Sequence, residues 1–160
     1  RDAVVVDDEA QIIVAARVVR EPNDYEQLVP TLKEIKRNVG RMPVAATADA
    51  GYFSARAVTD RTVKGVDLYV PPNPVPKESG GPSASVRASM RDKLNSPGGQ
   101  QMYKKRNPTV EPVFAHIKHV RGYRQFLLRG LEQVNGEWSL ICMTHNLLKM
   151  FRAGKRPGSH

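Results

Sequence analysis

The chain begins with two apolar runs separated by a polar segment. Residues 3–6 are mostly β-branched, residues 12–19 are mostly apolar, and the segment between them contains Asp7, Asp8 and Glu9. Two such runs joined by a short polar segment predict a β-hairpin with an acidic turn. The three acids could serve as metal ligands, but a turn needs polar residues in any case, so we favour the turn.

A helical pattern follows the hairpin. Asp24 and Gln27 form a capping box after the helix-stopping Pro22, and Gly40 ends the pattern. Pro30 lies inside it, so this proline should either bend the helix or mark its real start. The apolar positions recur at helical intervals and are Tyr25, Leu28, Leu32, Ile35 and Val39.

A short apolar strand over residues 44–48 runs directly into Asp49. This places Asp49 at the carboxyl end of a buried strand, where α/β folds hold ligand-binding groups. The alternative, that Asp49 only hydrogen-bonds its own turn, stays open. Ser54 then caps a predicted helix over residues 54–64, and a second strand is expected over residues 66–70.

Four more segments complete the predicted order. Residues 71–85 are rich in Pro, Gly and Ser and predict a flexible loop or an insertion site. A basic helix over residues 86–94 is ended by the Ser-Pro-Gly-Gly sequence at 96–99. A final helix over residues 137–151 should cover the sheet, with His145 as a satisfied core histidine. Its apolar positions also include Trp138, Ile141, Cys142, Leu148 and Phe151.

The most informative stretch is a helix that carries one acid among cations. Asn107 can cap this helix and Pro108 fits its first position, with Glu111 in the first turn and Lys118 two turns later. A lone acid in a basic run suits a metal ligand beside a phosphate-binding surface. The alternative is that Glu111 only belongs to a solvated face and favours the helix dipole. The apolar face comprises Val110, Val113, Phe114 and Ile117.

The uneven distribution of charge supports a phosphate-binding surface around Glu111. The 160-residue chain has a net charge of +9 and is 40% hydrophobic, which predicts a folded domain with a polyanionic partner. Residues 1–86 contain 11 basic and 12 acidic side chains, whereas residues 87–131 contain 10 basic and 2 acidic ones. Nucleic acid is therefore the favoured partner over a membrane surface, and solubility alone is the alternative.

Cysteine content and hydropathy bear on the compartment. Cys142 is the only cysteine, so the chain has no disulfide framework, and a cytosolic location with core packing for this thiol is expected. The sequence shows no signal peptide and no apolar run of about 20 residues, so we expect no membrane partner.

Two further patterns lie near the helix of Glu111. After it, charge alternates with aromatics in a way that suits phosphate contacts and base stacking, although Phe126 and Leu127 could equally be buried. His116 and His119 have the spacing of a metal pair, but no partner acid is evident. The alternating side chains are Arg121, Tyr123, Arg124, Phe126 and Arg129.

The order of these elements predicts an α/β fold with a mixed sheet flanked by helices. Asp49 on a strand end and Glu111 on a helix could meet at one rim of that sheet. Two acids there could hold two Mg²⁺ ions about 3.5–4 Å apart, as in-line phosphoryl transfer requires.

Three segments together resemble an insertion-sequence transposase of the DDE class, a family with an RNase H-like catalytic core. They are residues 48–54, 103–106 and 110–118. The segments 11–16, 21–24, 27–30 and 130–148 also resemble these enzymes, so the resemblance covers nearly the whole chain. It implies DNA transposition, with metal-dependent cleavage and strand transfer at transposon ends.

The resemblance also implies roles for individual residues. Asp49 would be the second catalytic aspartate and Glu111 the catalytic glutamate, both binding Mg²⁺ or Mn²⁺. Tyr103, Arg106 and Lys118 would form a signature that contacts transposon-end DNA. The interval from Arg106 to Glu111 is one residue longer than in that signature, so Lys105 could replace Arg106. The remaining expected DNA contacts are Lys104, Arg121 and Arg124.

One part of the family pattern is not matched. The first catalytic aspartate should lie on a strand before the hairpin, but here the chain begins at the hairpin. We therefore expect a partial DDE domain over residues 1–151 that lacks its first strand, followed by a basic tail over residues 152–160. The two-metal site would be incomplete and activity impaired; the alternative is an inactive DNA-binding remnant. Expected partners are DNA and either a second copy or a full-length transposase, in the bacterial cytoplasm near the nucleoid.

Overall fold

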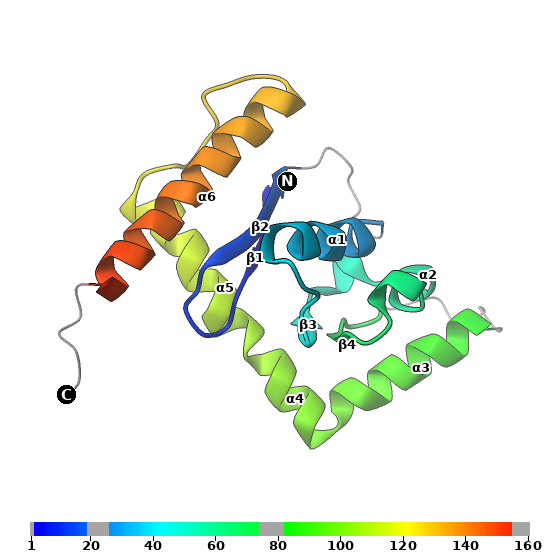
Figure 1. The fold of residues 1–160 in the computed structure, drawn as a ribbon. Helices are drawn as coiled ribbons and strands as arrows, with labels where there is room; N and C mark the ends of the chain where they lie inside the picture. The colour runs from blue at the N-terminus through cyan, green and yellow to red at the C-terminus, as the bar shows by residue number, and fades with distance from the viewer. Residues whose placement is uncertain (1, 19–25, 74–81, 155–160) are drawn as a thin grey trace, which may run out of the picture. The chain divides into compact units, whose positions relative to one another are not determined.

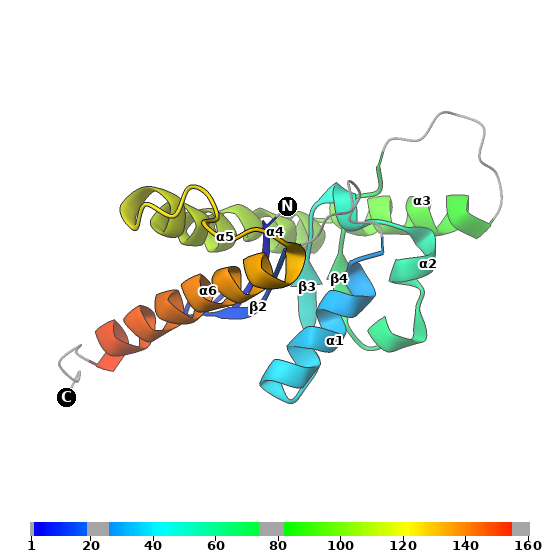
Figure 2. The ribbon, with the colours of Figure 1, turned by 90° about the horizontal axis from the view of Figure 1, so that it is seen from above.

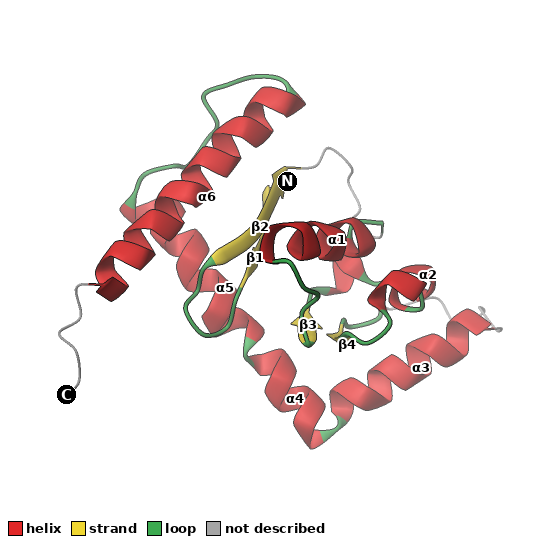
Figure 3. Cartoon of the chain, viewed as in Figure 1, coloured by secondary structure: helices red, strands yellow, loops and turns green. Residues whose placement is uncertain are grey.

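The chain forms two compact units that each combine strands with helices. A computed structural model describes residues 2–18, 26–73 and 82–154. Unit 1 comprises Arg1–Arg20 and Asn107–His160, and unit 2 comprises Glu21–Arg106. Figure 3 shows helices and short strands throughout, which confirms the predicted α/β class.

Unit 1 begins with the predicted hairpin. Strand β1 (Asp2–Val6) pairs with β2 (Ile13–Val18) in antiparallel orientation. The Asp7 carboxylate accepts hydrogen bonds from the backbone N–H groups of Ala10, at 2.8 Å, and Ile12, at 2.6 Å. Asp7 therefore shapes the turn, as predicted for this acidic segment.

The hairpin contains a β-bulge that decides which way β2 faces. Val5 pairs with Ala15 but Val6 pairs with Ile13, so Val14 is an extra residue in β2. A bulge shifts the alternation of a strand by one residue. As a result, Ile13 and Val18 both belong to the core cluster, although they lie an odd number of residues apart.

Helix α6 (Leu131–Gly154) lies along β2 and covers the hairpin, as Figure 1 shows. Trp138 is the largest side chain of this core, and its indole N–H donates to the Ala3 carbonyl at 3.2 Å. The covering role predicted for the final helix is confirmed, but the helix begins at Leu131 rather than at residue 137. Phe151, predicted to be apolar-facing, is 58% exposed because α6 continues past the start of β2. The buried core residues are Ile13, Val18, Val113, Ile117, Trp138, Ile141 and Cys142.

Two asparagines of α6 bind the backbone of β2 directly. The Asn135 side chain accepts from the Val18 N–H at 2.7 Å and donates to the Val18 carbonyl at 3.1 Å. The Asn146 side chain makes the same pair of contacts with Ile13, both at 2.8 Å. Each amide satisfies one donor and one acceptor of the strand, as a neighbouring strand would.

Helix α5 (Arg106–Ala115) continues into η3 (His116–Val120), a π-helical segment. Val113 and Ile117 are fully buried and Phe114 stacks on Trp138, which confirms the predicted apolar face. The helix starts at Arg106, so Asn107 lies inside its first turn rather than capping it.

Helix α5 also tolerates an internal proline because another residue replaces the lost hydrogen bond. Pro112 has no N–H, which leaves the carbonyl of Pro108 without its helical donor. The Gln11 side-chain amide donates to that carbonyl at 3.2 Å. The turn before β2 is thereby attached to α5.

Unit 2 begins with helix α1 (Leu28–Val39). Pro30 falls in its first turn, so this proline marks the start of the helix, one of the two predicted outcomes. Gly40 adopts a left-handed φ of 82°, and its N–H donates to the Lys36 carbonyl at 2.8 Å, which ends the helix as predicted. The predicted capping residue Asp24 lies outside the described residues.

The second sheet of the described chain consists of β3 (Ala45–Thr47) and β4 (Asp67–Tyr69), paired in parallel (Figure 2). The predicted strands are confirmed, but the predicted mixed sheet is not formed by the described residues. The reason is the pairing: β3 and β4 bond only to each other, and β1 bonds only to β2.

The segment between β3 and β4 contains three short helical turns. They are η1 (Ala50–Tyr52), α2 (Ala55–Val58) and η2 (Arg61–Val63). Ser54 caps α2 as predicted, because its hydroxyl accepts from the Ala57 N–H at 3.1 Å. The helix predicted over residues 54–64 is interrupted because Asp60 caps a new turn by accepting from the Thr62 N–H at 2.7 Å.

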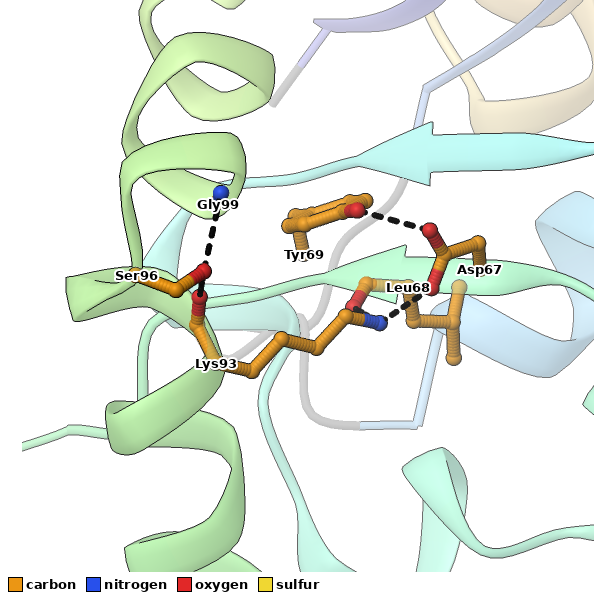
Figure 4. Close-up of polar contacts among 6 residues, drawn as sticks. All are labelled: Asp67, Leu68, Tyr69, Lys93, Ser96 and Gly99. Atoms are coloured by element: carbon orange, nitrogen blue, oxygen red, sulfur yellow. Dashed lines mark hydrogen bonds and ion pairs between the residues drawn. The ribbon is translucent and has the colours of Figure 1, made fainter.

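Helices α3 (Pro82–Asn95) and α4 (Pro97–Lys104) meet at a tight corner. The basic helix does end before Ser96, but it begins at Pro82, and the Ser-Pro-Gly-Gly sequence starts α4, a helix that the sequence interpretation lacked. The Ser96 hydroxyl caps α4 by accepting from the Gly99 N–H at 3.1 Å (Figure 4). Pro97 suits the first helical position.

Lys93 fastens α3 to β4. Its ammonium group pairs with the Asp67 carboxylate, donates to the Leu68 carbonyl at 2.8 Å and lies 4.3 Å from the centre of the Tyr69 ring (Figure 4). Asp67 also accepts from the Tyr69 hydroxyl at 2.6 Å. The Lys93 and Tyr69 hydrogen bonds lower the pKa of Asp67, and the Asp67 hydrogen bond raises the pKa of Tyr69.

Asn146→Ala should destabilise unit 1, because the Ile13 N–H and carbonyl both lose their side-chain partner. An unsatisfied buried backbone group costs about 1–3 kcal/mol, so we expect a loss of this size in the free energy of unfolding. Urea unfolding monitored by the fluorescence of Trp138, the only tryptophan, measures it. Ser139→Ala, at an exposed position of the same helix, is the control. Equal free energies of unfolding of the two variants would contradict a stabilising role of the Asn146 contacts with Ile13.

Gly99→Ala should destabilise the corner between α3 and α4, whereas Gly98→Ala should not. A Cβ atom on Gly99 would lie 1.9 Å from the Lys93 carbonyl oxygen, while one on Gly98 would meet nothing within 4 Å. Overpacking costs about 1–3 kcal/mol, and alanine in an open helical position gains up to about 1 kcal/mol over glycine. Hydrogen exchange of the α3 and α4 amides in both variants tests this difference.

Candidate active site

Asp49 lies two residues after Thr47, the last residue of β3, and so near the carboxyl end of the strand as predicted, although β3 is half-buried rather than buried. It caps η1, and its Oδ1 accepts from the Gly51 N–H at 3.0 Å. One carboxylate oxygen therefore does bond its own turn, as the simpler interpretation required. The side chain remains 49% exposed, so its second oxygen is accessible to ligands.

That second oxygen faces Arg106, from the other predicted motif of unit 2. Arg106 Nη2 lies 3.5 Å from Asp49 Oδ2. An ion pair this long and this exposed contributes at most about 1 kcal/mol to stability. Its importance is positional, since it joins two segments of the resemblance that are 57 residues apart in the chain.

The rest of the basic segment lies at the end of α4. Tyr103 and Lys104 belong to the last turn of α4, and Lys105 follows as its C-cap. Tyr103 is half-buried, whereas Lys104 and Lys105 are exposed. The segment therefore presents two lysines to solvent next to the arginine that meets Asp49.

Unit 1 contains the remaining predicted site residues. Glu111 is exposed on α5, and Arg124 is exposed in the loop before α6. Lys118 belongs to η3, and its Nζ lies 4.9 Å from the centre of the Phe114 ring. Asp49 and Glu111 thus belong to different units, and their convergence on one metal site stays a prediction.

Arg121 has a structural role that sequence reasoning missed. Its guanidinium donates to the Ile141 carbonyl at 3.3 Å and to the Thr144 hydroxyl at 2.6 Å, and it lies 5.0 Å from the centre of the Tyr123 ring. Arg121 therefore fixes the end of η3 to α6. The spacing of charges alone could not distinguish this role from a DNA contact.

The loop before α6 contains one partly buried aromatic side chain and two exposed leucines. Phe126 packs edge-on against Trp138 and is partly buried, which bears out the buried alternative for this residue in part. Leu127 is 81% exposed, so the buried alternative is wrong there. The Glu137 carboxylate holds the loop by accepting from the Leu127 and Leu128 N–H groups.

Carboxylates are the ligand type that Mg²⁺ and Mn²⁺ prefer, so Asp49 and Glu111 fit these ions chemically. Within residues 2–18, 26–73 and 82–154, no group of three or more His, Cys, Asp or Glu side chains is arranged to hold a metal ion. Across the same residues, no helix is both long and apolar enough to cross a membrane.

His116 meets His145 rather than His119. The two Nδ1 atoms lie 3.3 Å apart, and the rings are inclined at 70°. His145 is 1% exposed, which confirms a core position; the backbone of Gln11 lies close to its imidazole, but Nε2 makes no hydrogen bond of regular geometry within the described chain. Burial lowers the pKa of both imidazoles, and the cations Arg121 and Lys149 lower both further, with Arg152 acting on His116. A backbone hydrogen bond with Gln11 raises the pKa of His145 but does not reverse the shift.

These lowered pKa values predict that unit 1 loses stability in acid. The unfolded imidazoles titrate near 6.5 and the folded ones at lower pH, so the unfolded chain binds more protons below pH 6.5. The contribution of the imidazoles to the free energy of unfolding should be fully present above pH 6.5. It should fall as the pH drops, by at most about 1.4 kcal/mol per pH unit for each imidazole. Urea unfolding at several pH values measures this slope. His116→Gln should reduce it, whereas His119→Gln, at an exposed position, should not.

Comparison with known proteins finds a match to one protein family. A family described as "Transposase DDE domain" matches residues 80–151. No curated protein and no solved structure matches the chain. The matched segment contains Tyr103, Arg106, Glu111 and Lys118, which carried much of the resemblance. Residues 80–151 are therefore similar to a transposase DDE domain.

Proposed function

We propose that this chain takes part in DNA cleavage and strand transfer at the ends of an insertion sequence, with an RNase H-like fold as its framework and with impaired activity because the first catalytic aspartate of the family pattern is not matched. The family match connects the chain with transposition. The main structural support for DNA cleavage and strand transfer is the contact between Asp49 and Arg106, which lie 3.5 Å apart. It brings a predicted catalytic acid next to a predicted DNA-binding arginine.

Asp49 and Glu111 would hold the divalent ions, Mg²⁺ or Mn²⁺. Bound metal would stabilise the attacking and leaving oxygens during phosphoryl transfer. The chain itself contributes orientation, because the Gly51 N–H fixes one Asp49 oxygen and leaves the other directed at Arg106. The exposure of both acids is compatible with access by a phosphate backbone.

The DNA contact would be made by the basic residues around these acids. The position of Arg106 beside Asp49 supports Arg106 over Lys105 as the signature arginine. Arg121 already bonds to α6, so we expect it to contribute less than its neighbours. The proposed DNA-binding set is Tyr103, Lys104, Lys105, Arg106, Lys118, Arg124 and, to a smaller extent, Arg121. Such a protein would work on DNA in the bacterial cytoplasm, with a second copy or a longer transposase as its partner.

A DNA-binding protein without catalysis is the second candidate. The observation that favours it is that the accessible oxygen of Asp49 faces a cation rather than a second acid. Such a protein would bind DNA in a salt-dependent manner, because Lys and Arg displace counterions from phosphates. It would not cleave in the presence of Mg²⁺.

Asp49→Asn and Glu111→Gln should each abolish metal-dependent nicking of a plasmid that contains the element's ends. We expect a loss of more than about 100-fold, since even changes in residues around metal ligands cost 10–100-fold. Rates of nicking in Mg²⁺, in Mn²⁺ and with a chelator measure the effect.

Two matched controls exist for this experiment. Asp60 caps η2 as Asp49 caps η1, and Glu132 lies in the first turn of α6, so Asp60→Asn and Glu132→Gln should retain the rate of the parent chain. Nicking that survives either site substitution would reject that residue. Salt-dependent binding without any nicking by the parent chain would favour the second candidate.

A further inference from the structure

Unit 1 contains a pocket that the proposed transfer site does not use. Its volume is about 210 Å³, and it lies among the turn before β2, helix α5 with η3, and helix α6. Pockets for drug-sized ligands measure about 300–1,000 Å³, so this one suits a smaller group. The lining residues are Gln11, Pro112, Val113, His116, His145, Leu148, Lys149 and Arg152.

The two histidines give the pocket unused hydrogen-bonding capacity. Their Nδ1 atoms face each other at 3.3 Å, so one proton can serve that contact. His145 is almost completely buried; the backbone of Gln11 lies close to its imidazole, but Nε2 makes no hydrogen bond of regular geometry among the residues that the structure describes. A buried polar atom normally has a partner, and a bound group would supply one.

The charged groups that face the imidazoles are cations from two elements. Lys149 and Arg152 come from α6, and Arg121 follows η3. Lys149 donates one hydrogen bond to Gln11 Oε1 at 2.8 Å, which leaves its other two N–H groups for further acceptors. Three positive charges disfavour a metal ion at the histidine pair and attract an anion.

We propose that this pocket binds a phosphate group, held by Lys149 and Arg152 and by an imidazole N–H of the His116–His145 pair. Guanidinium and ammonium groups form strong charge-assisted bonds to phosphate oxygens. The negative charge would offset the three cations, so the imidazole pair takes up a proton when phosphate binds. The group could belong to DNA or to a free phosphate. Neither Asp49 nor Glu111 takes part.

The experiment follows the imidazole signals by NMR during pH titration. Inorganic phosphate should raise the pKa of His116 or His145, whereas chloride at equal ionic strength should not. Short oligonucleotides with and without a 5′-phosphate are titrated in parallel. Binding of inorganic phosphate alone assigns the pocket to free phosphate, and binding of either oligonucleotide assigns it to DNA; both results support the proposal.

Arg152→Gln tests the rim of the pocket without changing its buried floor, because Arg152 is exposed. It should weaken phosphate binding about tenfold, whereas Arg129→Gln, at an exposed position outside the pocket, should leave it unchanged. An unchanged imidazole pKa in phosphate, or equal effects of the two substitutions, would overturn the proposal. Loss of nicking in Asp49→Asn leaves this result unaffected, so the two proposals fail separately.

Discussion

Unit 1 depends on the paired amide contacts between α6 and β2. Asn135 and Asn146 are eleven residues apart in a helix, which corresponds to about 16.5 Å at 1.5 Å per residue. Val18 and Ile13 are five residues apart, but their partners Asp2 and Val6 are four residues apart on β1, which corresponds to about 13 Å. The two spans are comparable in length, and both asparagines bind the same strand.

The β-bulge makes this match possible. Residues five apart in a regular strand turn their backbone groups to opposite edges of the sheet. The extra residue, Val14, restores the same direction for Ile13 and Val18, so α6 can bind both from one side. With α6 fixed in this register, Trp138 lies against Phe114 and His145 against His116, and α5 receives its position from these contacts. The helix that carries Glu111 is thus placed by residues that have no part in chemistry.

Local patterns allowed some of this structure to be predicted. The hairpin, the position of Asp49 after a strand and the Ser54 cap depend on residues close in sequence, and the structure confirms them. Helix α4 was missed because Ser96 and Pro97 serve equally well to end one helix and to start the next. The contacts of Asn135, Asn146 and Arg121 could not be predicted, since their partners are distant in the chain. The same reason explains why His116 was first paired with His119, its neighbour along the helix.

Gln11 shows how one residue can connect several segments. Its backbone adopts a left-handed φ of 56°, which costs a residue with a side chain about 1–2 kcal/mol. In return its amide nitrogen reaches Pro108 in α5 and its amide oxygen reaches Lys149 in α6. The tip of the hairpin therefore contacts both helices through one side chain. Lengthening that turn by one residue would disturb both of these contacts at the edge of the opening beside the two histidines.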